Sequence, residues 1–251
     1  MSLLDTTIIV TGGANGLGSH YTRYLVALGA RVLVADLDDE SGQALAKSLN
    51  EEHRAERVVA LRVDTTSEAD TLEMAQVALS RLGSIDVLVN NVGLYPHTPF
   101  DEVDLDLWHR VISVNLDSPF LCTKAVVPAM REAGRGKIVN VATNLVWMGL
   151  PEMVHYVAAK AGVVGLTRSL ARALGPQGIT VNALAPGATA PNLDEVDDEG
   201  LMRLAQIVSH QCVKWFERPG DLQGPLAFLC SPDSDFISGQ VLTVDGGLTM
   251  H

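Results

Sequence analysis

Cysteine and basic charge are scarce in this sequence, and each scarcity excludes a class of protein. The cysteines number three, Cys122, Cys212 and Cys230, and they are widely spaced with no CxxC pair. This pattern argues against a disulfide framework or a zinc site, so we expect three reduced core thiols and no bound metal. Acidic residues outnumber basic ones by 30 to 18, giving a net charge of −12. Such a surface repels phosphate groups, so neither nucleic acid nor a membrane is expected as a partner.

Long hydrophobic runs and targeting signals are also lacking. No apolar run is long enough to span a bilayer, and the first residues, MSLLDTTIIV, contain no basic segment followed by a signal-length apolar stretch. We therefore expect a soluble, cytoplasmic protein. The sequence has no internal repeat, low-complexity tract or interdomain linker. Because 47% of its 251 residues are hydrophobic, residues 1–251 are expected to form a single domain with a substantial core.

Short apolar or β-branched runs alternate with helical patterns along most of the chain. Strands are predicted at 6–10, 31–35, 57–63, 85–89, 137–142, 179–184 and 241–244. Helices are predicted at 21–28, 41–50, 67–82, 105–121, 122–132, around 156 and near 221–229. This alternation predicts βαβ units and a parallel α/β sheet, on which ligands bind beyond the carboxyl ends of the strands. The polar or glycine residues at predicted strand ends are Gly12, Asp36, Asp64, Asn90 and Thr143.

A glycine-rich turn, TGGANGLG, directly follows the first predicted strand. Gly12, Gly16 and Gly18 permit positive φ and let the backbone approach a ligand. The helix that follows presents free N–H groups and a partial positive charge, which suits a pyrophosphate. The spacing is GxxxGxG rather than GxGxxG, but its position between a strand and a helix favours a phosphate-binding turn.

Asp36 ends the second predicted strand. A carboxylate at this place accepts hydrogen bonds from a ribose 2′-hydroxyl and repels a 2′-phosphate. No arginine lies just before or after Asp36, so NAD is favoured over NADP. The alternative role, an N-cap for the next helix, fits Asp38 or Asp39 better.

Tyr156 and Lys160 stand four residues apart in a segment with helical spacing of apolar residues. Residues at this spacing lie on one face of a helix, which places a phenol beside an ammonium group. The pKa of a free tyrosine is about 10, and a nearby positive charge is expected to lower it. Thr143 adds a hydroxyl at the end of the preceding strand, and the three groups suit polarisation of a carbonyl. Taken alone, the tyrosine–lysine pair is more often a packed aromatic beside a solvated charge.

Residues 188–216 differ in character from the rest of the chain. The stretch PNLDEVDDEG is acidic and turn-prone, while LMRLAQIV is amphipathic. A polar insert after a strand end is typical of a mobile lid over a site, or of a solvated surface loop.

Several motifs occur together and in order: TGGANGLG, Asp64, NNVG, Asn115, VNVAT, YVAAK, the PG of APGAT and SGQVLTVDGG. With these motifs the sequence resembles the short-chain dehydrogenase/reductase family from about Thr6 to Gly247. The resemblance implies a single Rossmann-fold domain, with a doubly wound parallel sheet of about seven strands flanked by helices. It also implies a nicotinamide cofactor, hydride transfer at carbon, and a homotetramer built through the helices around Asn115 and Tyr156.

Carried over residue by residue, the resemblance assigns roles to particular side chains. Tyr156 would be the general acid/base, Lys160 would lower its pKa and hold the nicotinamide ribose, and Asn115 would support a water linking Lys160 to solvent. Thr143 takes the place of the family's serine, keeping the hydroxyl but adding a methyl group. The residues expected to bind NAD are Gly12, Asn15, Gly16, Leu17, Gly18, Asp36, Leu37, Asp64, Thr65, Asn91, Gly93, Tyr156, Lys160, Pro186, Gly187 and Thr189.

Three further positions depart from the family pattern. Thr65 stands where an apolar residue is common, and Val92 replaces the alanine of NNAG. Several residues after its proline–glycine pair, the family commonly has a threonine that contacts the nicotinamide amide. Here Thr189 comes earlier and Pro191 follows.

A mostly apolar substrate pocket is predicted from side chains that flank the catalytic positions. The candidates are Tyr95, Leu145, Trp147, His155, Met202, Ile207 and Trp215, with Pro96 and His97 beside them. The combination of NNVGLYP with HY before the lysine resembles family members that act on aromatic secondary alcohols and ketones. We therefore expect reversible, NAD-dependent oxidation of a secondary alcohol to a ketone.

Two other functions fit parts of the sequence. A 3-oxoacyl thioester reductase using NADPH is opposed by Asp36, and by the acidic surface, which would repel an acidic carrier protein. An NAD-binding regulator without turnover is opposed by the complete set of Tyr156, Lys160 and Asn115. Only the threonine at position 143 favours the regulator.

Overall fold

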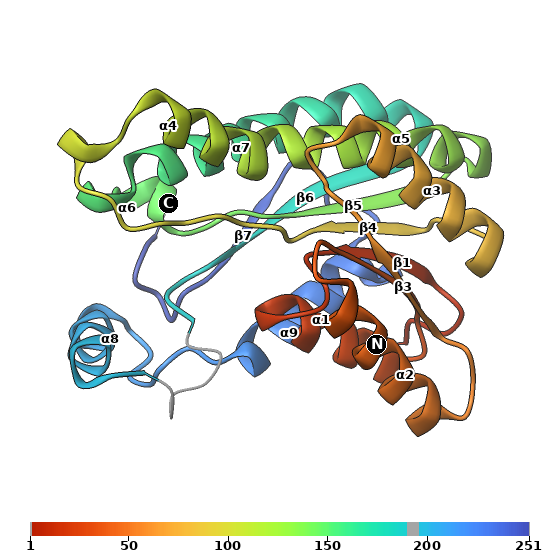
Figure 1. Cartoon of the computed structure of the whole chain (residues 1–251), viewed down its shortest axis with the longest axis horizontal. Coiled ribbons are helices and arrows are strands. Elements are labelled where there is room, and N and C mark those ends of the chain that lie inside the picture. Colours follow the sequence, from red (N-terminus) through yellow and green to blue (C-terminus); the bar gives the residue numbers. More distant parts are fainter. Residues whose placement is uncertain (1, 190–195, 251) are drawn as a thin grey trace.

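Seven parallel strands form one sheet in the order β3-β2-β1-β4-β5-β6-β7. The strands are β1 (Thr7–Thr11), β2 (Arg31–Asp36), β3 (Val58–Arg62), β4 (Val87–Asn90), β5 (Gly136–Val141), β6 (Ile179–Pro186) and β7 (Val241–Val244). The computed structural model describes residues 2–189 and 196–250 (Figure 1). The predicted single α/β domain with a doubly wound parallel sheet is confirmed.

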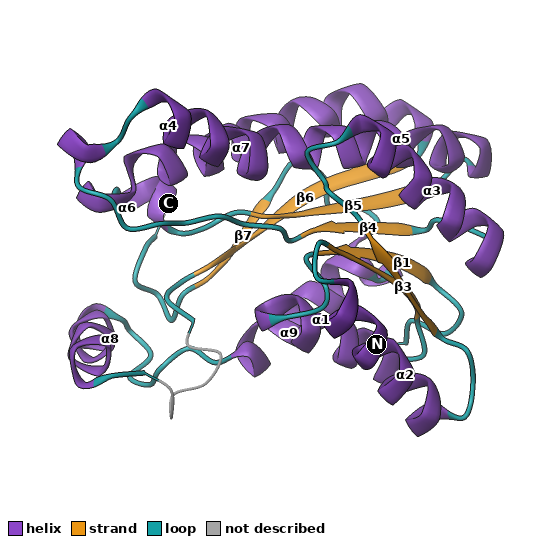
Figure 2. Cartoon of the chain, in the orientation of Figure 1, coloured by secondary structure: helices purple, strands orange, loops and turns teal. Residues whose placement is uncertain are grey.

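Two layers of helices cover the sheet (Figure 2). One face carries α1 (Gly16–Ala27), α2 (Asp39–His53) and α9 (Pro219–Cys230), and the other carries α3 (Glu68–Leu82), α4 (Leu105–Ile112), α5 (Ser118–Ala133) and α7 (Val154–Leu174). Two further helices, α6 (Leu145–Met148) and α8 (Asp198–His210), lie beyond the carboxyl ends of β5 and β6, at the left of Figure 1. The segments at this end of the sheet are those that carry the predicted site.

Side chains of the buried strands alternate between two cores, one on each face of the sheet. In β1, Ile8 and Val10 belong to the core shared with α1 and α9, whereas Ile9 belongs to the core under α3 and α5. A strand that is buried on both faces requires apolar residues at successive positions, which explains the run TIIVT. The connection after β1 goes to one face and the connection after β4 to the other, so a crevice opens between their carboxyl ends.

The chain around Asn115 differs from the predicted helices. A helix boundary is expected between residues 121 and 122, but α5 continues through them, and α4 gives way to a π-helical turn at Ser113–Asp117. The Nδ2 of Asn115 donates to the carbonyl of Val111 at 2.9 Å and competes with the regular helical hydrogen bonds. The predicted boundary is therefore wrong, and the turn buries Asn115 completely.

The cysteines are only partly as predicted. Cys122 and Cys230 are buried, but Cys212 is exposed, so its prediction as a core thiol is wrong. Cys212 follows α8, and its Sγ donates to the carbonyl of Gly247 at 3.4 Å. Within residues 2–189 and 196–250, no helix combines the length and apolar character needed to cross a bilayer. In the same part of the chain, no group of three or more His, Cys, Asp or Glu side chains could hold a metal ion.

Candidate active site

The turn between β1 and α1 is shaped by its glycines. Gly12 and Gly16 have φ of +60° and +49°, in the left-handed region that favours glycine. A Cβ on Gly18 would lie 1.8 Å from the carbonyl oxygen of Gly12. From the end of β4, Nδ2 of Asn91 donates to the carbonyls of Thr11 and Gly12 at 3.1 and 3.0 Å. The turn is thus held tightly against α1 with no side chain between them, which leaves its backbone open to a ligand.

The N-terminus of α1 opens into the same space as this turn. Its N-cap residue, Asn15, makes no side-chain hydrogen bond to the first turn of the helix, and that turn carries no acidic residue. Asn15 instead donates to Asp38 at 2.9 Å. The positive end of the helix dipole is therefore not neutralised within the helix, and an anionic group such as a pyrophosphate suits it.

Asp36, at the end of β2, is bound to the glycine turn. Its carboxylate accepts hydrogen bonds from the backbone N–H of Ala14 at 3.0 Å and of Asp38 at 3.1 Å. The N-cap of α2 is Asp38, which accepts from the N–H of Ser41 at 3.0 Å, so the prediction that Asp38 or Asp39, rather than Asp36, caps this helix is confirmed. Asp36 remains available at the far end of the crevice as a negatively charged side chain.

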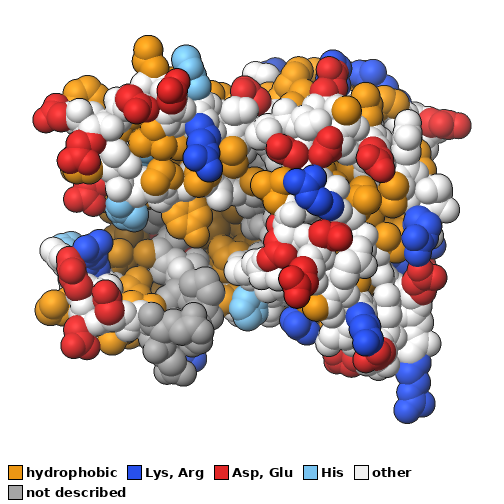
Figure 3. All heavy atoms as spheres, in the orientation of Figure 1, with side chains coloured by type: hydrophobic (Ala, Val, Ile, Leu, Met, Phe, Trp, Pro, Cys, Tyr) orange, Lys and Arg blue, Asp and Glu red, His pale blue; other side chains and the backbone are white. Residues whose placement is uncertain are grey.

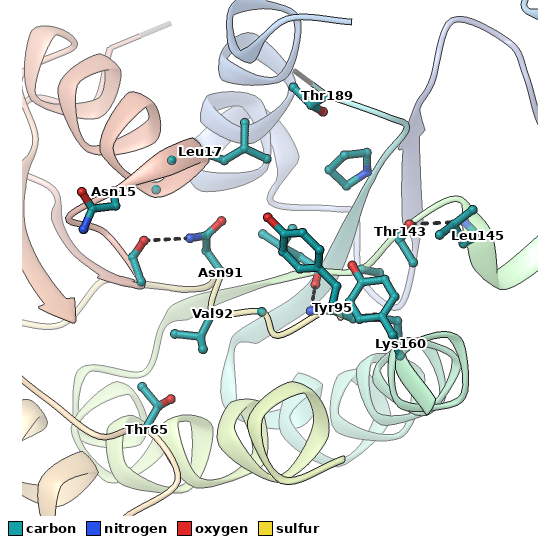
Figure 4. A pocket seen from close by; sticks show the side chains of 18 of the residues that line it. Asn15, Leu17, Thr65, Asn91, Val92, Tyr95, Thr143, Leu145, Lys160 and Thr189 are labelled. Atoms are coloured by element: carbon teal, nitrogen blue, oxygen red, sulfur yellow. Dashed lines mark hydrogen bonds between the residues drawn. The ribbon is translucent and has the colours of Figure 1, made fainter. Parts of the chain in front are cut away.

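One cavity of about 650 Å³ joins the glycine turn to the carboxyl ends of β4, β5 and β6 (Figure 4). This volume is within the usual range for small-molecule and cofactor sites. Of the predicted catalytic and cofactor residues, it is lined by Gly12, Asn15, Gly16, Leu17, Gly18, Asp36, Leu37, Thr65, Asn91, Gly93, Thr143, Tyr156, Lys160, Pro186, Gly187 and Thr189. Of the predicted substrate residues, it is lined by Tyr95 and Leu145.

Polar side chains meet at the end of this cavity near α7. The Nζ of Lys160 lies 5.8 Å from the centre of the Tyr156 ring and donates to the carbonyl of Val141 at 2.8 Å. Thr143, just after β5, forms a side-chain hydrogen bond with the Tyr156 phenol. The ring of Tyr95 meets that of Tyr156 edge to face, with centres 5.9 Å apart. A hydroxyl, a phenol and an ammonium group therefore lie within reach of one small ligand.

Burial governs the ionisation of these groups. It raises the pKa of the Tyr156 phenol, Tyr95 adds to the rise, and the hydrogen bond with Thr143 opposes it. The expected net lowering of this pKa is therefore wrong, because the loss of solvent around the phenol dominates. Burial also lowers the pKa of Lys160 to about 8. At neutral pH the phenol is protonated and the lysine still mostly cationic, so a proton donor stands beside a positive charge.

Comparison with known proteins agrees with this geometry. A protein-family model described as Enoyl-(Acyl carrier protein) reductase matches residues 12–249. Over its whole length, the chain is 34% identical to L-rhamnose 1-dehydrogenase (NAD(P)(+)) of Azotobacter vinelandii, of which it covers 99%. It is 37% identical to trans-4-hydroxycyclohexanecarboxylate dehydrogenase of Sinomonas cyclohexanicum, over 98% of this chain and 93% of that protein. The chain belongs to the short-chain dehydrogenase/reductase family.

A solved structure of the same family superposes closely on this one. It is named "Short-chain dehydrogenase/reductase SDR:Glucose/ribitol dehydrogenase" of Brucella melitensis, and it aligns with a TM-score of 0.88 and 31% identity. The alignment covers 99% of this chain and 98% of that one. The protein is thus an oxidoreductase that acts on CH–OH groups, with the fold its relatives share.

Asn115 of this short-chain dehydrogenase/reductase supports the site from outside the cavity. Its Oδ1 accepts from the backbone N–H of Leu94 at 3.2 Å, and its Nδ2 donates to the Leu94 carbonyl at 2.7 Å. A Cβ on Gly93 would lie 3.5 Å from the same Oδ1. Asn115 therefore fixes the loop after β4 that forms the cavity wall. The water link from Asn115 to Lys160 stays a prediction.

Several predicted site residues are not brought into the cavity, namely Asp64, Trp147, His155, Met202, Ile207 and Trp215. The Asp64 carboxylate accepts from the backbone N–H and hydroxyl of Thr66 at 2.9 and 2.6 Å, and so stabilises its own turn. His155 is fully buried, and its Nδ1 accepts from the N–H of Tyr156 at 2.9 Å. Trp147 packs against a small core that contains Ala142.

The three candidates from the predicted lid lie on or after α8. Met202 and Trp215 are 67% and 62% exposed, and Ile207 is half-buried. Their prediction as pocket residues assumes that the insert folds over the site, whereas in the structure no residue of α8 is buried. Residues 190–195 of the same insert lie outside the described residues.

The cavity is also lined by residues that the sequence did not single out: Val63, Val141, Ala142, Met153 and Ala188. Most of them adjoin a predicted residue, as Val63 adjoins Asp64 and Ala142 adjoins Thr143. A prediction that included both neighbours of each strand-end residue would have found Val63 and Ala142. For Met153 the sequence offers no such signal, because it lies in a separate turn before α7.

Proposed function

We propose that this protein is an NAD-dependent dehydrogenase that interconverts a secondary alcohol, bearing an apolar or aromatic substituent, and its ketone. The main support is the meeting of Tyr156, Lys160 and Thr143 at one end of a cavity that has Asp36 at the other. The first three groups suit proton exchange with an oxygen on carbon, and the carboxylate suits an unphosphorylated ribose. One end of the cavity thus suits the alcohol or ketone, and the other suits NAD, so both fit the proposed reaction.

The residues present fit a nicotinamide dinucleotide. The space that a Cβ on Gly18 would fill lies against Gly12, and the adjoining N-terminus of α1 would hold the pyrophosphate. Asp36 would hold the adenosine ribose, and Lys160 the ribose at the reacting end. When bound, the dinucleotide accepts a hydride from the alcohol or gives one to the ketone.

The chain's own residues would manage the proton and the charge on the substrate oxygen. Thr143 would donate a hydrogen bond to that oxygen, and Tyr156 would exchange a proton with it. Because burial raises the pKa of Tyr156, its phenol is well suited to protonate an alkoxide during ketone reduction. In alcohol oxidation the phenol must first lose its proton to solvent, and the positive charge of Lys160 would stabilise the resulting phenolate, which then takes the proton of the alcohol.

The substrate class is inferred from the walls beside Tyr156. Tyr95, Leu145 and Met153 give this end an apolar lining, and His97, which pairs with Glu152 at 3.3 Å, adds a polar edge. A relative named for a hydroxycyclohexane ring supports an alicyclic or aromatic substituent, while one named for rhamnose extends the range to sugars. These walls and relatives favour a secondary alcohol on or beside a ring.

The insert at 188–216 is proposed as a lid over this substrate. Its helix α8 buries no side chain, and hydrophobic side chains line the hollow between α8 and the rest of the molecule (Figure 3). An amphipathic helix held over an apolar hollow is suited to close on a substrate and exclude water.

A panel of substrates tests the proposed reaction. Pure protein would be mixed with NAD or NADP and with aryl carbinols, alkyl carbinols, sugars and hydroxyacyl thioesters, and the near-ultraviolet absorbance of the reduced cofactor followed. We expect turnover of aryl or alicyclic carbinols with NAD. Activity confined to NADP and thioesters would instead show a 3-oxoacyl thioester reductase. Tight NAD binding without turnover of any substrate would favour the regulator.

The cofactor preference rests on Asp36 and is expected to weaken in Asp36→Asn. The substitution keeps the size of the side chain but removes the charge that repels a 2′-phosphate. We expect the ratio of kcat/KM for NAD to that for NADP to fall by about 10- to 100-fold. This range corresponds to the loss of one repulsion, partly screened by solvent, between a carboxylate and the 2′-phosphate of NADP. The matched control is Asp39→Asn, which changes the net charge equally in an exposed side chain outside the cavity. An equal change in the control would mean that net charge, not Asp36, sets the preference.

A further inference from the structure

Glu217 is a buried acid directly behind the cavity wall that follows β6. Its side chain is only 6% exposed, and it comes from the segment between α8 and α9. One carboxylate oxygen accepts from the hydroxyl of Thr189 at 2.5 Å, and the other accepts from the backbone N–H of Gly187 at 3.1 Å. Thr189 lines the cavity (Figure 4), and so does Gly187, whereas Glu217 is not among the lining residues. Within residues 2–189 and 196–250, Glu217 therefore acts on a ligand through these two residues.

The bond to Glu217 fixes the hydrogen-bonding sense of the Thr189 hydroxyl. A threonine hydroxyl has one proton and two lone pairs, and here the proton points at the carboxylate. Only lone pairs remain for the cavity, so Thr189 can accept a hydrogen bond from a ligand but cannot donate one. A group at this part of the wall must then carry an N–H or O–H. In a nicotinamide dinucleotide, the ring at the reacting end bears such a group, the NH₂ of its carboxamide.

We propose that Glu217 is a positioning residue that sets Thr189 as the hydrogen-bond acceptor for the carboxamide NH₂ of the nicotinamide ring. This inference rests on the proposed use of a nicotinamide cofactor. With the acceptor fixed, one orientation of the carboxamide is preferred, and the face that the ring presents to Tyr156 is selected with it. A cofactor whose ring lacks N–H donors would lose this contact.

The surroundings of Glu217 add a dependence on pH. The charged groups that face it are Asp245 and Asp221, both acidic, and Tyr21 of α1 is packed nearby. Burial raises the pKa of Glu217 to about 7, the two aspartates add to the rise, and the bonds from Thr189 and Gly187 oppose it. Above this pH the carboxylate can only accept. Below it, the added proton can be donated to Thr189, whose own proton is then free to turn toward the cavity.

Two variants separate this role from simple packing. In Glu217→Gln, the amide nitrogen can donate to Thr189 while the amide oxygen still accepts from Gly187, so the Thr189 hydroxyl is reversed at nearly constant volume. The N–H of Gly187 also donates to the carbonyl of Val244 at 3.0 Å and stays paired in either case. In Thr189→Val the hydroxyl is removed and the shape is kept.

The test compares NAD with 3-acetylpyridine adenine dinucleotide, which has a methyl group in place of the carboxamide NH₂. Titration calorimetry at about pH 8.5 should show the unmodified protein binding NAD more tightly than the analogue by about 10-fold, the range of one hydrogen bond to a fixed acceptor. The ratio of the affinity for NAD to that for the analogue should approach about 1 in both variants. For the unmodified protein, the ratio of the two affinities should also fall as the pH is lowered from about 8.5 to about 5.5. In Glu217→Gln this ratio should not change with pH.

The outcomes distinguish this inference from the proposed function. If the unmodified protein binds neither dinucleotide, the proposed cofactor is wrong. If it binds both but shows no preference for NAD, or if Glu217→Gln weakens both equally and keeps the ratio, Glu217 has no role in orientation. Should Glu217→Gln fail to fold, as judged by its melting temperature, Thr189→Val and the pH series decide. An unchanged ratio in either would overturn the inference.

Discussion

Tyr156→Phe is expected to lower kcat/KM for alcohol oxidation by about 10²- to 10⁴-fold, the usual contribution of a general acid/base. The substitution removes one oxygen and keeps the ring, which packs edge to face with Tyr95 and lies below the ammonium group of Lys160. Because the packing is preserved, the dissociation constant for NAD should change by less than about 3-fold. Steady-state kinetics with the best alcohol of the panel, together with titration calorimetry, measures both quantities.

The matched control for this variant is Tyr95→Phe. Tyr95 lines the same cavity and loses the same atom, but it is 62% exposed and lies in the loop after β4, not one helical turn from Lys160 on α7. We expect kcat/KM to fall by less than about 10-fold. If the two variants lose equal activity, the proton is exchanged elsewhere. If Tyr156→Phe keeps full turnover, the proposed mechanism is wrong.

The sheet and the glycine turn were predictable because local patterns determine them. A strand buried on both faces needs an unbroken apolar run such as TIIVT, and a turn whose backbone touches a helix needs glycine at Gly18. The carboxyl ends of parallel strands meet at one edge, so residues far apart in sequence, such as Asp36 and Thr143, could be assigned to one site. No contact between distant side chains had to be known for these predictions.

The direction of individual side chains was less predictable. His155 and Tyr156 are neighbours in sequence, but successive residues of a helix do not face the same way, and only the tyrosine reaches the cavity. Asp64 follows β3 closely, much as Asp36 ends β2, yet its carboxylate turns back to Thr66. Such choices depend on hydrogen-bonding partners within a few residues, which composition and periodicity do not reveal.

The electrostatics of the site required the complete fold. The spacing of Tyr156 and Lys160 suggests a lowered tyrosine pKa, but burial of the phenol raises it, and Tyr95, which comes from a separate segment, adds to the rise. Glu217 had no signal in the sequence for the same reason. Its partners, Gly187 and Thr189, lie in a different segment, and only packing brings them together.

Gly18→Ala is expected to abolish NAD binding, with a dissociation constant raised by at least about 100-fold. The added Cβ would lie 1.8 Å from the carbonyl oxygen of Gly12 and 2.8 Å from Nδ2 of Asn91. These atoms belong to the backbone of the turn and to the side chain that holds it, so the turn must move away from α1. We also expect the free energy of unfolding to fall by about 1–3 kcal/mol, as overpacking usually costs.

Melting temperatures with and without NAD separate the effect of Gly18→Ala on binding from its effect on folding. A ligand that binds the folded state raises the melting temperature as its concentration exceeds the dissociation constant. NAD should therefore raise the melting temperature of the unmodified protein and leave that of Gly18→Ala unchanged. The control is Gly220→Ala in the first turn of α9, an exposed helical glycine where a Cβ would meet no atom within 4 Å outside the adjoining residues. It should stabilise the protein by about 0.5–1 kcal/mol, because alanine favours a helix more than glycine does, and it should keep the full shift with NAD. If NAD still raised the melting temperature of Gly18→Ala, the turn could move without losing its ligand. Close packing of the turn against α1 would then not be what forms the site.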